Sequence, residues 1–258
     1  MKQNKGLFAF VILVYSFLFI PIIIIAATSF GSESYVAFPP RGFSLKWYHN
    51  VFTTESFIRT FKISMEVSVL ATLIALALGI PGAYALTRFD FKGKTLLKNF
   101  FFSPKIVPGV VTGFVMFQFI VINLKLPIYY SLLLGLSIFE IPYAIRVIGS
   151  SLEMVDYTME EAAMSLGASR LQTFFRVVFP NITSGIIASF MLSFISAFNN
   201  VPVTLFLSGP GISTLPITMM NYVEYNYDPT ISALSVLLML MTIGIMFVVE
   251  KTLGINNL

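Results

Sequence analysis

Residues 158–181 read TMEEAAMSLGASRLQTFFRVVFPN, a polar and helix-forming segment that lies between two long apolar blocks. Thr158 is followed three residues later by Glu161, which predicts a capping box, because each side chain can satisfy a free backbone N–H at a helix start. Glu160 and Glu161 would occupy the first turn, where the helix dipole favours negative charge. Gly167 is placed to end the helix in a left-handed conformation. The stretch therefore predicts a short, capped helix.

A second helix is predicted directly after that glycine. Ser169 can cap it, and its span over 170–178 places four apolar side chains on one face, Leu171, Phe174, Phe175 and Val178. Pro180 then breaks the helix before the next apolar block. The two helices and their turn predict a compact projection, although a helix that merely lies on a membrane surface explains this pattern equally well.

The composition indicates an all-α integral membrane protein. The 258 residues are 57% hydrophobic and 11% charged, with a mean hydropathy of +0.86, whereas a soluble domain carries about 25% charged residues. The formal charge of +4 arises without a run of Lys and Arg, so we expect no nucleic-acid partner. Cysteine is absent and His49 is the only histidine, which excludes disulfides and disfavours zinc sites and Ser-His-Asp triads.

Six apolar blocks are long enough to cross a bilayer, which takes about 20 residues. They lie at about 7–27, 63–86, 100–121, 128–149, 183–206 and 231–250. The first exceeds a signal-peptide core of about 7–15 residues, so we interpret it as an uncleaved span. Residues 1–258 are expected to form a single transmembrane domain. Four prolines interrupt the third and fourth blocks, which predicts broken helices that line a cavity, or simple kinks: Pro104, Pro108, Pro127 and Pro142.

The distribution of Lys and Arg predicts the orientation of the chain. With the N-terminus in the cytoplasm, ten basic residues fall in inner segments and five in outer segments. Both termini and the loop at 150–182 are therefore expected in the cytoplasm, with the loops at 28–62 and 207–230 outside. Trp47-Tyr48, in the first outer loop, suits an anchor at the membrane interface.

Residues 161–180 resemble the EAA signature of binding-protein-dependent ABC importer permeases, which reads E-A-A-x3-G-x9-I-x-L-P. Five signature positions match at the right spacing, Glu161, Ala162, Ala163, Gly167 and Pro180. Val177 and Phe179 stand for Ile and Leu, and both replacements are apolar. A gapped match of this kind, in the cytoplasmic loop before the penultimate span, is specific.

The resemblance implies a type I ABC importer permease fold and makes this loop the coupling helix, which seats in a groove on an ATPase subunit. The residues expected to couple are Glu160, Glu161, Ala162, Ala163, Gly167 and Pro180. The implied partners are a second, homologous permease in a heterodimer, an ATPase dimer and an extracytoplasmic substrate-binding protein, at a bacterial inner membrane. The chain would be no enzyme and bind no cofactor, because ATP and Mg²⁺ belong to the ATPase.

Three further segments resemble the spermidine/putrescine-type branch of that family. SLKWYHNVF at 44–52 resembles its S-x-x-W-Y segment, GAYALTRFDFKGK at 82–94 its A-x-x-R-x-x-F-x-G-K turn, and SGPGISTLPITM at 208–219 its G-P-x-x-x-x-L-P stretch. These matches imply import of a polyamine, opine or aminoalkylphosphonate. Gly93-Lys94-Thr95 is only the tail of a phosphate-binding loop, because Arg88 stands where that loop requires glycine.

Polar side chains within the apolar blocks are candidates for the substrate pathway, since they are costly in lipid and usually face protein or a cavity. The candidates are Lys105, Gln118, Glu140, Asn199, Asn200 and Thr204. Lys105 and Glu140 could instead form an ion pair that locks two helices, and the Asn pair could hydrogen-bond between helices. Related polyamine permeases often carry acidic residues where Asn199-Asn200 stands, so the neutral pair leaves room for a zwitterion, an opine or a phosphonate.

Two other classes of protein fit the sequence less well than an alternating-access permease. A secondary transporter driven by an ion gradient would need carboxylates at membrane depth, and only Glu140 qualifies. A membrane enzyme would need a nucleophile-base pair or a metal site, which one histidine and no cysteine make hard to assemble. The sequence therefore favours the permease, with no catalytic residue and no metal.

Overall fold

The computed structural model describes residues 5–102 and 107–253. Within those ranges the regular secondary structure is entirely helical, apart from one isolated β-bridge between Gly209 and Ile212. This confirms the all-α prediction. The chain divides into two compact units, which we call the terminal unit (residues 1–59 and 218–258) and the central unit (residues 60–217).

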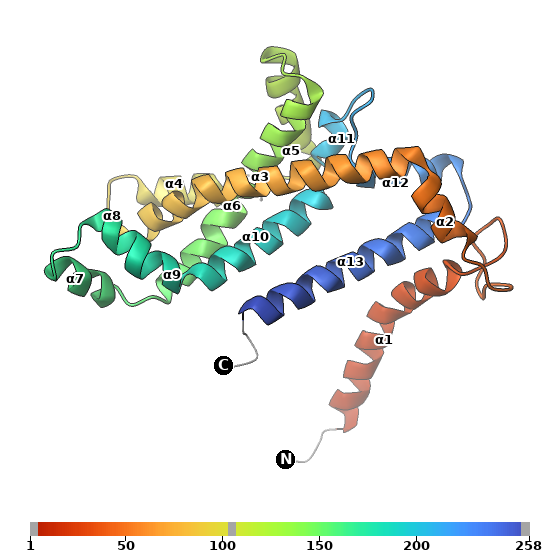
Figure 1. Ribbon diagram of the computed structural model, residues 1–258, viewed down its shortest axis with the longest axis horizontal. Helices are drawn as coiled ribbons and strands as arrows, with labels where there is room; N and C mark the ends of the chain where they lie inside the picture. Colours follow the sequence, from red (N-terminus) through yellow and green to blue (C-terminus); the bar gives the residue numbers. More distant parts are fainter. Residues whose placement is uncertain (1–4, 103–106, 254–258) are drawn as a thin grey trace. The chain divides into compact units, whose positions relative to one another are not determined.

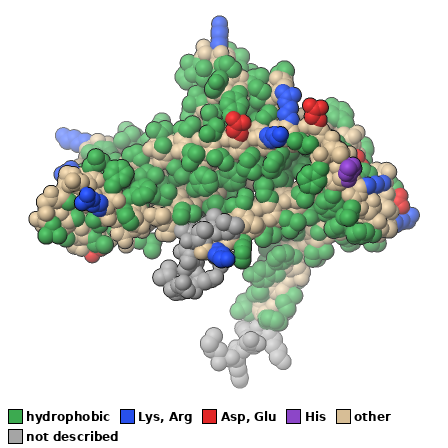
Figure 2. Space-filling model, in the orientation of Figure 1, with side chains coloured by type: hydrophobic (Ala, Val, Ile, Leu, Met, Phe, Trp, Pro, Cys, Tyr) green, Lys and Arg blue, Asp and Glu red, His purple; other side chains and the backbone are tan. Residues whose placement is uncertain are grey.

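Among the described residues, four helices are long and apolar enough to cross a membrane, namely α1 (Lys5–Thr28), α3 (Glu55–Arg88), α6 (Ile128–Glu153) and α13 (Thr230–Leu253). They correspond to the first, second, fourth and sixth predicted spans. A fifth span results if the helical segments Arg170–Asn181 and Thr183–Phe198, which meet at 68°, are counted as one. Hydrophobic side chains cover most of the face shown in Figure 2, and charged side chains are sparse on it.

The third predicted span starts in the wrong place. Residues 100–102 belong to a separate helix, α4 (Lys94–Phe102), and the apolar helix begins only after Pro108. It consists of α5 (Gly109–Met116) and the π-helix η2 (Phe117–Asn123), together about 22 Å long at 1.5 Å per residue. That is shorter than a hydrocarbon core of about 30 Å.

The fourth predicted span is a longer continuous helix in the structure, and the fifth is a shorter one. α6 runs through Pro142 without a break. This proline is buried, and inside a membrane protein neighbouring groups can satisfy the backbone carbonyl that its missing N–H leaves free. α10 (Thr183–Phe198) ends eight residues earlier than predicted, and the short helix α11 (Thr204–Leu207) follows it after a turn. The apolar run from 183 to 206 is therefore one helix, a turn and a second helix.

Small residues bring the helices of the central unit close together. α6 packs along α10, where a Cβ on Gly185 would lie 2.5 Å from the Ser151 Cβ. α6 also meets α3, where a Cβ on Gly79 would lie 2.5 Å from the Ala144 Cβ. Close backbone approach through small residues is typical of helices that associate in lipid. The buried core around these contacts includes Leu76, Ala83, Leu86, Ile145, Ile148, Leu152, Val178 and Ile182.

The terminal unit is held together by α13, which packs against α1 and against α2 (Lys46–Thr53). α12 (Leu215–Tyr225) enters this unit just before α13. Trp47 of α2 is only 7% exposed, and its indole N–H donates to the Gly31 carbonyl at 2.7 Å. The predicted interface anchor at Trp47 is therefore wrong, because this side chain closes the loop that precedes α2.

Candidate functional site

The predicted coupling loop projects at one end of the central unit, beside the C-terminal end of α3 (Figure 1). Its first helix, α7, covers Thr158–Ser165, and Asp156 Oδ1 accepts a hydrogen bond from the Thr158 N–H at 2.9 Å. That bond lowers the pKa of Asp156 below its usual value of 3.8. The predicted capping box between Thr158 and Glu161 does not form, because Thr158 is the first helical residue and Asp156 supplies the cap.

Glu160 is buried and anchors α7 to α3. Its Oε1 lies 2.7 Å from Arg88 Nε, and its Oε2 accepts a hydrogen bond from the Tyr84 hydroxyl at 2.8 Å. The Arg88 and Glu160 side chains are 10% and 1% exposed, so water screens this ion pair weakly. The Arg88 N–H is not aligned on the oxygen, which makes the contact a charge pair rather than a linear hydrogen bond.

Arg88 also holds the segment that leads into α7. Its Nη2 donates to the Val155 carbonyl at 2.8 Å, and its guanidinium carbon lies 5.5 Å from the centre of the Tyr157 ring. One arginine at the end of α3 therefore contacts the approach to α7 as well as its first turn. α3 is 34 residues long, about 51 Å at 1.5 Å per residue. It is therefore long enough to cross a hydrocarbon core of about 30 Å and to extend beyond it.

The other glutamate of the first turn has the opposite environment. Glu161 and Ala162 are exposed, and Ala163 is half-buried. Glu160 thus binds inside the chain, whereas Glu161, which occupies the glutamate position of the EAA signature, has its carboxylate in the open. The two adjacent carboxylates are separated by the geometry of one helical turn, in which neighbouring residues point to different sides.

Gly167 ends α7 as predicted. Its φ of +88° lies in the left-handed region, which glycine occupies without steric cost. The N–H of Gly167 donates to the Met164 carbonyl at 3.0 Å, and that of Ala168 donates to the Ala163 carbonyl at 3.1 Å, so the last carbonyls of the helix are satisfied. A Cβ added at Gly167 would meet no atom within 4 Å, and the backbone alone therefore requires glycine there.

The second predicted helix is capped as expected but ends later. Ser169 Oγ accepts from the Gln172 N–H while the Gln172 side chain accepts from the Ser169 N–H, a complete capping box. The helix comprises α8 (Arg170–Thr173), the π-helix η3 (Phe174–Val178) and α9 (Phe179–Asn181). Pro180 lies inside it and the bend follows at Ile182, because the wider π-turn that precedes the proline accommodates its missing N–H.

Large apolar side chains are exposed over this projection. The least covered are Leu166 at 90%, Met154 at 88% and Leu171 at 69%. Met159, Phe175 and Tyr157 add to the same projection with exposures of 45%, 59% and 43%. An apolar surface around a polar helix, rather than an isolated exposed leucine, is typical of a protein-protein or membrane contact.

The structure distributes the predicted pathway residues over several helices and a turn. Lys105 lies outside the described residues, together with Pro104, so its predicted pairing with Glu140 is not described. Glu140 is completely buried in α6, and its Oε1 accepts a hydrogen bond from Ser196 Oγ of α10 at 2.8 Å. Gln118 is exposed on η2. Glu140 therefore links two helices of the central unit in this conformation.

Asn199 and Asn200 follow the last residue of α10 instead of lying inside a helix. Asn199 is the exposed residue that ends α10, and its Nδ2 donates to the Ile195 carbonyl at 3.0 Å. Asn200 is buried, its Oδ1 accepts from the Val203 N–H at 2.9 Å, and its carbonyl accepts from the Thr204 hydroxyl. Both side chains bond to backbone groups near the turn between α10 and α11, and their place in the substrate pathway stays a prediction.

The match to a family model decides what kind of protein this is. The model described as "Binding-protein-dependent transport system inner membrane component" matches residues 71–251, which include α7 and the whole loop around it. The chain belongs to this family. It is an inner-membrane permease subunit of an ABC importer and a transport component rather than an enzyme, which confirms the prediction from the EAA signature and supports it over the ion-coupled alternative.

Curated relatives agree with this assignment. The permease is 29% identical over 250 residues to the spermidine/putrescine transport system permease protein PotC of Haemophilus influenzae, with 96% of each chain covered. It is 30% identical over 232 residues to the putrescine transport system permease protein PotI of Escherichia coli, covering 87% of this chain and 82% of that protein.

Solved structures agree on the fold of the permease. A bacterial ABC transporter involved in import of the acidic polysaccharide alginate matches at a TM-score of 0.72 and 20% identity, over 97% of this chain and 98% of that chain. The MetNI methionine ABC transporter matches at a TM-score of 0.63 and 18% identity, over 76% and 93% of the two chains. Within residues 5–102 and 107–253, no group of three or more His, Asp or Glu side chains could hold a metal.

Sequence reasoning missed the residues that hold the coupling loop in place. Tyr84 and Arg88 lie in the 82–94 segment, which entered the sequence analysis only as a family resemblance. A signal was present, since the arginine comes at the end of an apolar run and Glu160 is a second glutamate that the EAA signature does not require. Which two charges pair across 72 residues of sequence follows only from the fold.

Proposed function

We propose that the coupling loop transmits ATP-driven motion from an ATPase dimer to this permease. The observation that carries the proposal is that two adjacent glutamates of α7 have different surroundings, one buried and paired and the other exposed. Glu160 is tied to α3 through Arg88, while Glu161 and Ala162 are exposed on the same helix. A push on α7 would therefore reach α3 directly, because a buried charge pair resists separation.

A charge reversal tests this role. Glu161→Arg should reduce ATPase stimulation by the binding protein in the reconstituted complex at least about tenfold, since an exposed contact to the partner becomes repulsive. Asp90→Arg, which reverses a 99% exposed carboxylate on the same predicted side but outside the loop at 150–182, serves as the matched control and should leave stimulation near that of the native complex. Equal loss in both variants, or none in Glu161→Arg, would contradict the proposal.

The proposed topology has six spans with both termini in the cytoplasm. Four long apolar helices and the bent pair around Ile182 support five of these spans, and the 15-residue apolar helix Gly109–Asn123 is the candidate for the sixth. The excess of Lys and Arg in the segments assigned to the inside supports the orientation. In this arrangement residues 1–258 form one transmembrane domain, and α7 faces the cytoplasm.

The proposed assembly contains a second, homologous permease, two ATPase subunits and an extracytoplasmic binding protein. The family description, which names binding-protein dependence, supports the last of these. One structural neighbour is a bacterial alginate ABC transporter in complex with a periplasmic protein that carries an alginate pentasaccharide, which supports the same kind of partner. ATP and Mg²⁺ would bind the ATPase subunits, and the heterodimer is inferred from the branch that the sequence resembles.

The proposed cargo is a small polar organic solute of the polyamine, opine or aminoalkylphosphonate class. The printed functions of PotC and PotI support a polyamine. The neutral Asn199 and Asn200 argue against a strong requirement for polycations, and Glu140, with Thr204, remains a proposed pathway group that another conformation would expose. Uptake of labelled putrescine, spermidine and 2-aminoethylphosphonate into proteoliposomes that contain the whole complex distinguishes the classes.

A further inference from the structure

An open cavity with charged walls lies in the central unit, apart from both the coupling helix and the proposed pathway residues. Its volume is about 200 Å³, and residues of α3, α4 and α6 line it. Small residues form part of the wall, including Ala83 and Gly149, and leave room for a ligand of several non-hydrogen atoms. Nothing in the coupling role described above requires this space.

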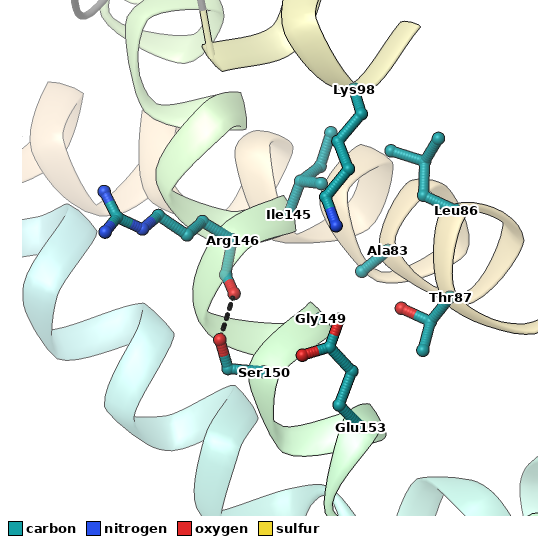
Figure 3. A pocket seen from close by; sticks show the side chains of 9 residues that line it. All are labelled: Ala83, Leu86, Thr87, Lys98, Ile145, Arg146, Gly149, Ser150 and Glu153. Carbon is teal, nitrogen blue, oxygen red and sulfur yellow. Dashed lines mark hydrogen bonds between the residues drawn. The ribbon is translucent and has the colours of Figure 1, made fainter. Parts of the chain in front are cut away.

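Three polar side chains point into the cavity from three different helices. Figure 3 shows the Lys98 ammonium, the Thr87 hydroxyl and the Glu153 carboxylate directed toward one another across the space. Arg146 and Ser150 also belong to the lining, but the Arg146 guanidinium and the Ser150 hydroxyl point away, and the latter donates to the Arg146 carbonyl at 3.1 Å. The cavity therefore presents one cation, one anion and one hydroxyl.

Lys98 and Glu153 face the same space without pairing. In the described part of the chain Arg88 pairs with Glu160 and Lys94 with Asp90, whereas no ion pair joins Lys98 to Glu153. A positive and a negative group held apart across a cavity match a ligand that itself carries both charges, with its anionic end at Lys98 and its ammonium at Glu153. A simple anion would meet repulsion at the carboxylate, and a simple cation would meet it at the ammonium.

The surroundings of the cavity are those of a lipid-covered surface. On α4, Leu96 and Phe100 lie two residues before and after Lys98 and therefore on the other side of the helix, where they are 74% and 66% exposed. On α3, Leu78 is 56% exposed on the stretch that leads to the cavity. A short helix with lysines on one side and bare Leu and Phe on the other is typical of a helix that lies in the membrane interface.

We propose that this cavity binds the zwitterionic headgroup of phosphatidylethanolamine in the cytoplasmic leaflet. The phosphate would lie at Lys98 and Thr87, and the primary ammonium would donate to Glu153. The acyl chains would run along the exposed apolar side chains of α3 and α4. The assignment to the cytoplasmic leaflet rests on the proposed topology, whereas headgroup binding does not depend on transport.

Native mass spectrometry of the purified permease complex tests the proposal. After exchange into equal amounts of three phospholipids, the native complex should retain phosphatidylethanolamine in preference to the other two. Phosphatidylcholine has an ammonium without an N–H, and phosphatidylglycerol has no ammonium group. Lys98→Met and Glu153→Gln should each reduce this retention about tenfold, the loss expected from one charged hydrogen bond. Lys94→Met is the matched control, because Lys94 lies on the same helix but pairs with Asp90 at 2.9 Å outside the cavity; it should retain the lipid.

Three outcomes would overturn the proposal. Equal retention of the three lipids, or retention unchanged in both cavity variants, would show that the cavity does not distinguish the lipid headgroups. Displacement of the lipid by millimolar free phosphoethanolamine or 2-aminoethylphosphonate would assign the cavity to a soluble zwitterion instead. A lower melting temperature in both variants, with no lipid retained by the native complex, would show that Lys98 and Glu153 stabilise the fold and do not bind lipid.

Discussion

At the scale of single residues, the two neighbouring carboxylates at the start of α7 have opposite surroundings. The Glu160 carboxylate is engaged on both oxygens, by Arg88 and Tyr84, and is almost completely shielded from water. Removal of one partner from such a pair leaves an uncompensated charge in a dry site. Glu161 has no comparable surroundings within the described part of the chain, and its loss should be felt only in the assembled transporter.

Glu160→Ala should therefore destabilise the permease by about 3–5 kcal/mol, whereas Glu161→Ala should change the free energy of unfolding by less than about 0.5 kcal/mol. Denaturant unfolding of the detergent-solubilised chain measures both. Equal stabilities for the two variants would show that the Arg88–Glu160 contact does not hold α7 in place.

Asp156 gives the start of α7 a dependence on pH. Its pKa is lowered in the fold because the carboxylate accepts the Thr158 N–H, so its contribution is present above the usual value of 3.8 and is lost as the pH falls through the lower folded value. Amide hydrogen exchange of α7, corrected for the intrinsic rate, should show weaker protection at the most acidic pH. Asp156→Asn, which keeps a capping oxygen without the charge, should remove this pH dependence; the same acid loss in that variant would contradict it.

At the scale of elements, the contact between α6 and α10 depends on the absence of a side chain at Gly185. A Cβ there would approach the Ser151 Cβ to 2.5 Å, whereas a Cβ on Gly149 of α6 would find its nearest neighbour, Thr87 Oγ1, at 3.8 Å. Gly185→Ala should cost about 1–3 kcal/mol through overpacking, and Gly149→Ala should be neutral or slightly stabilising. Melting temperatures of the two variants compare them directly, and a tolerated Gly185→Ala would mean that the helices are less closely packed.

The same scale shows how far the sequence alone could lead. The long uninterrupted spans and the glycine turn at Gly167 follow from local composition and backbone conformation, and both are recovered. The start of α5 and the end of α10 are not recovered, because an apolar run shows which residues are compatible with lipid but does not show where a helix begins or ends. Asn200 illustrates the limit, since its side chain accepts a hydrogen bond from the backbone of the next turn, a contact that the apolar run does not predict.

At the scale of the whole molecule, the absence of cysteine makes the chain suited to site-specific chemistry. A single introduced cysteine is the sole thiol of the permease, so any crosslink from it has a known origin. Ala162 is exposed on α7, the helix proposed to dock on the ATPase, and Ser34 is exposed in the loop assigned to the outside. The two positions differ in their expected partner as well as in their side of the membrane.

The most direct test of the coupling role is thiol crosslinking of the assembled transporter with a short bifunctional reagent, with native thiols removed from the partner subunits. Ala162→Cys should crosslink to an ATPase subunit that carries cysteines around its docking groove, and Ser34→Cys should not. A permease that crosslinks to the ATPase from Ser34→Cys but not from Ala162→Cys would contradict both the orientation and the docking surface proposed for this chain.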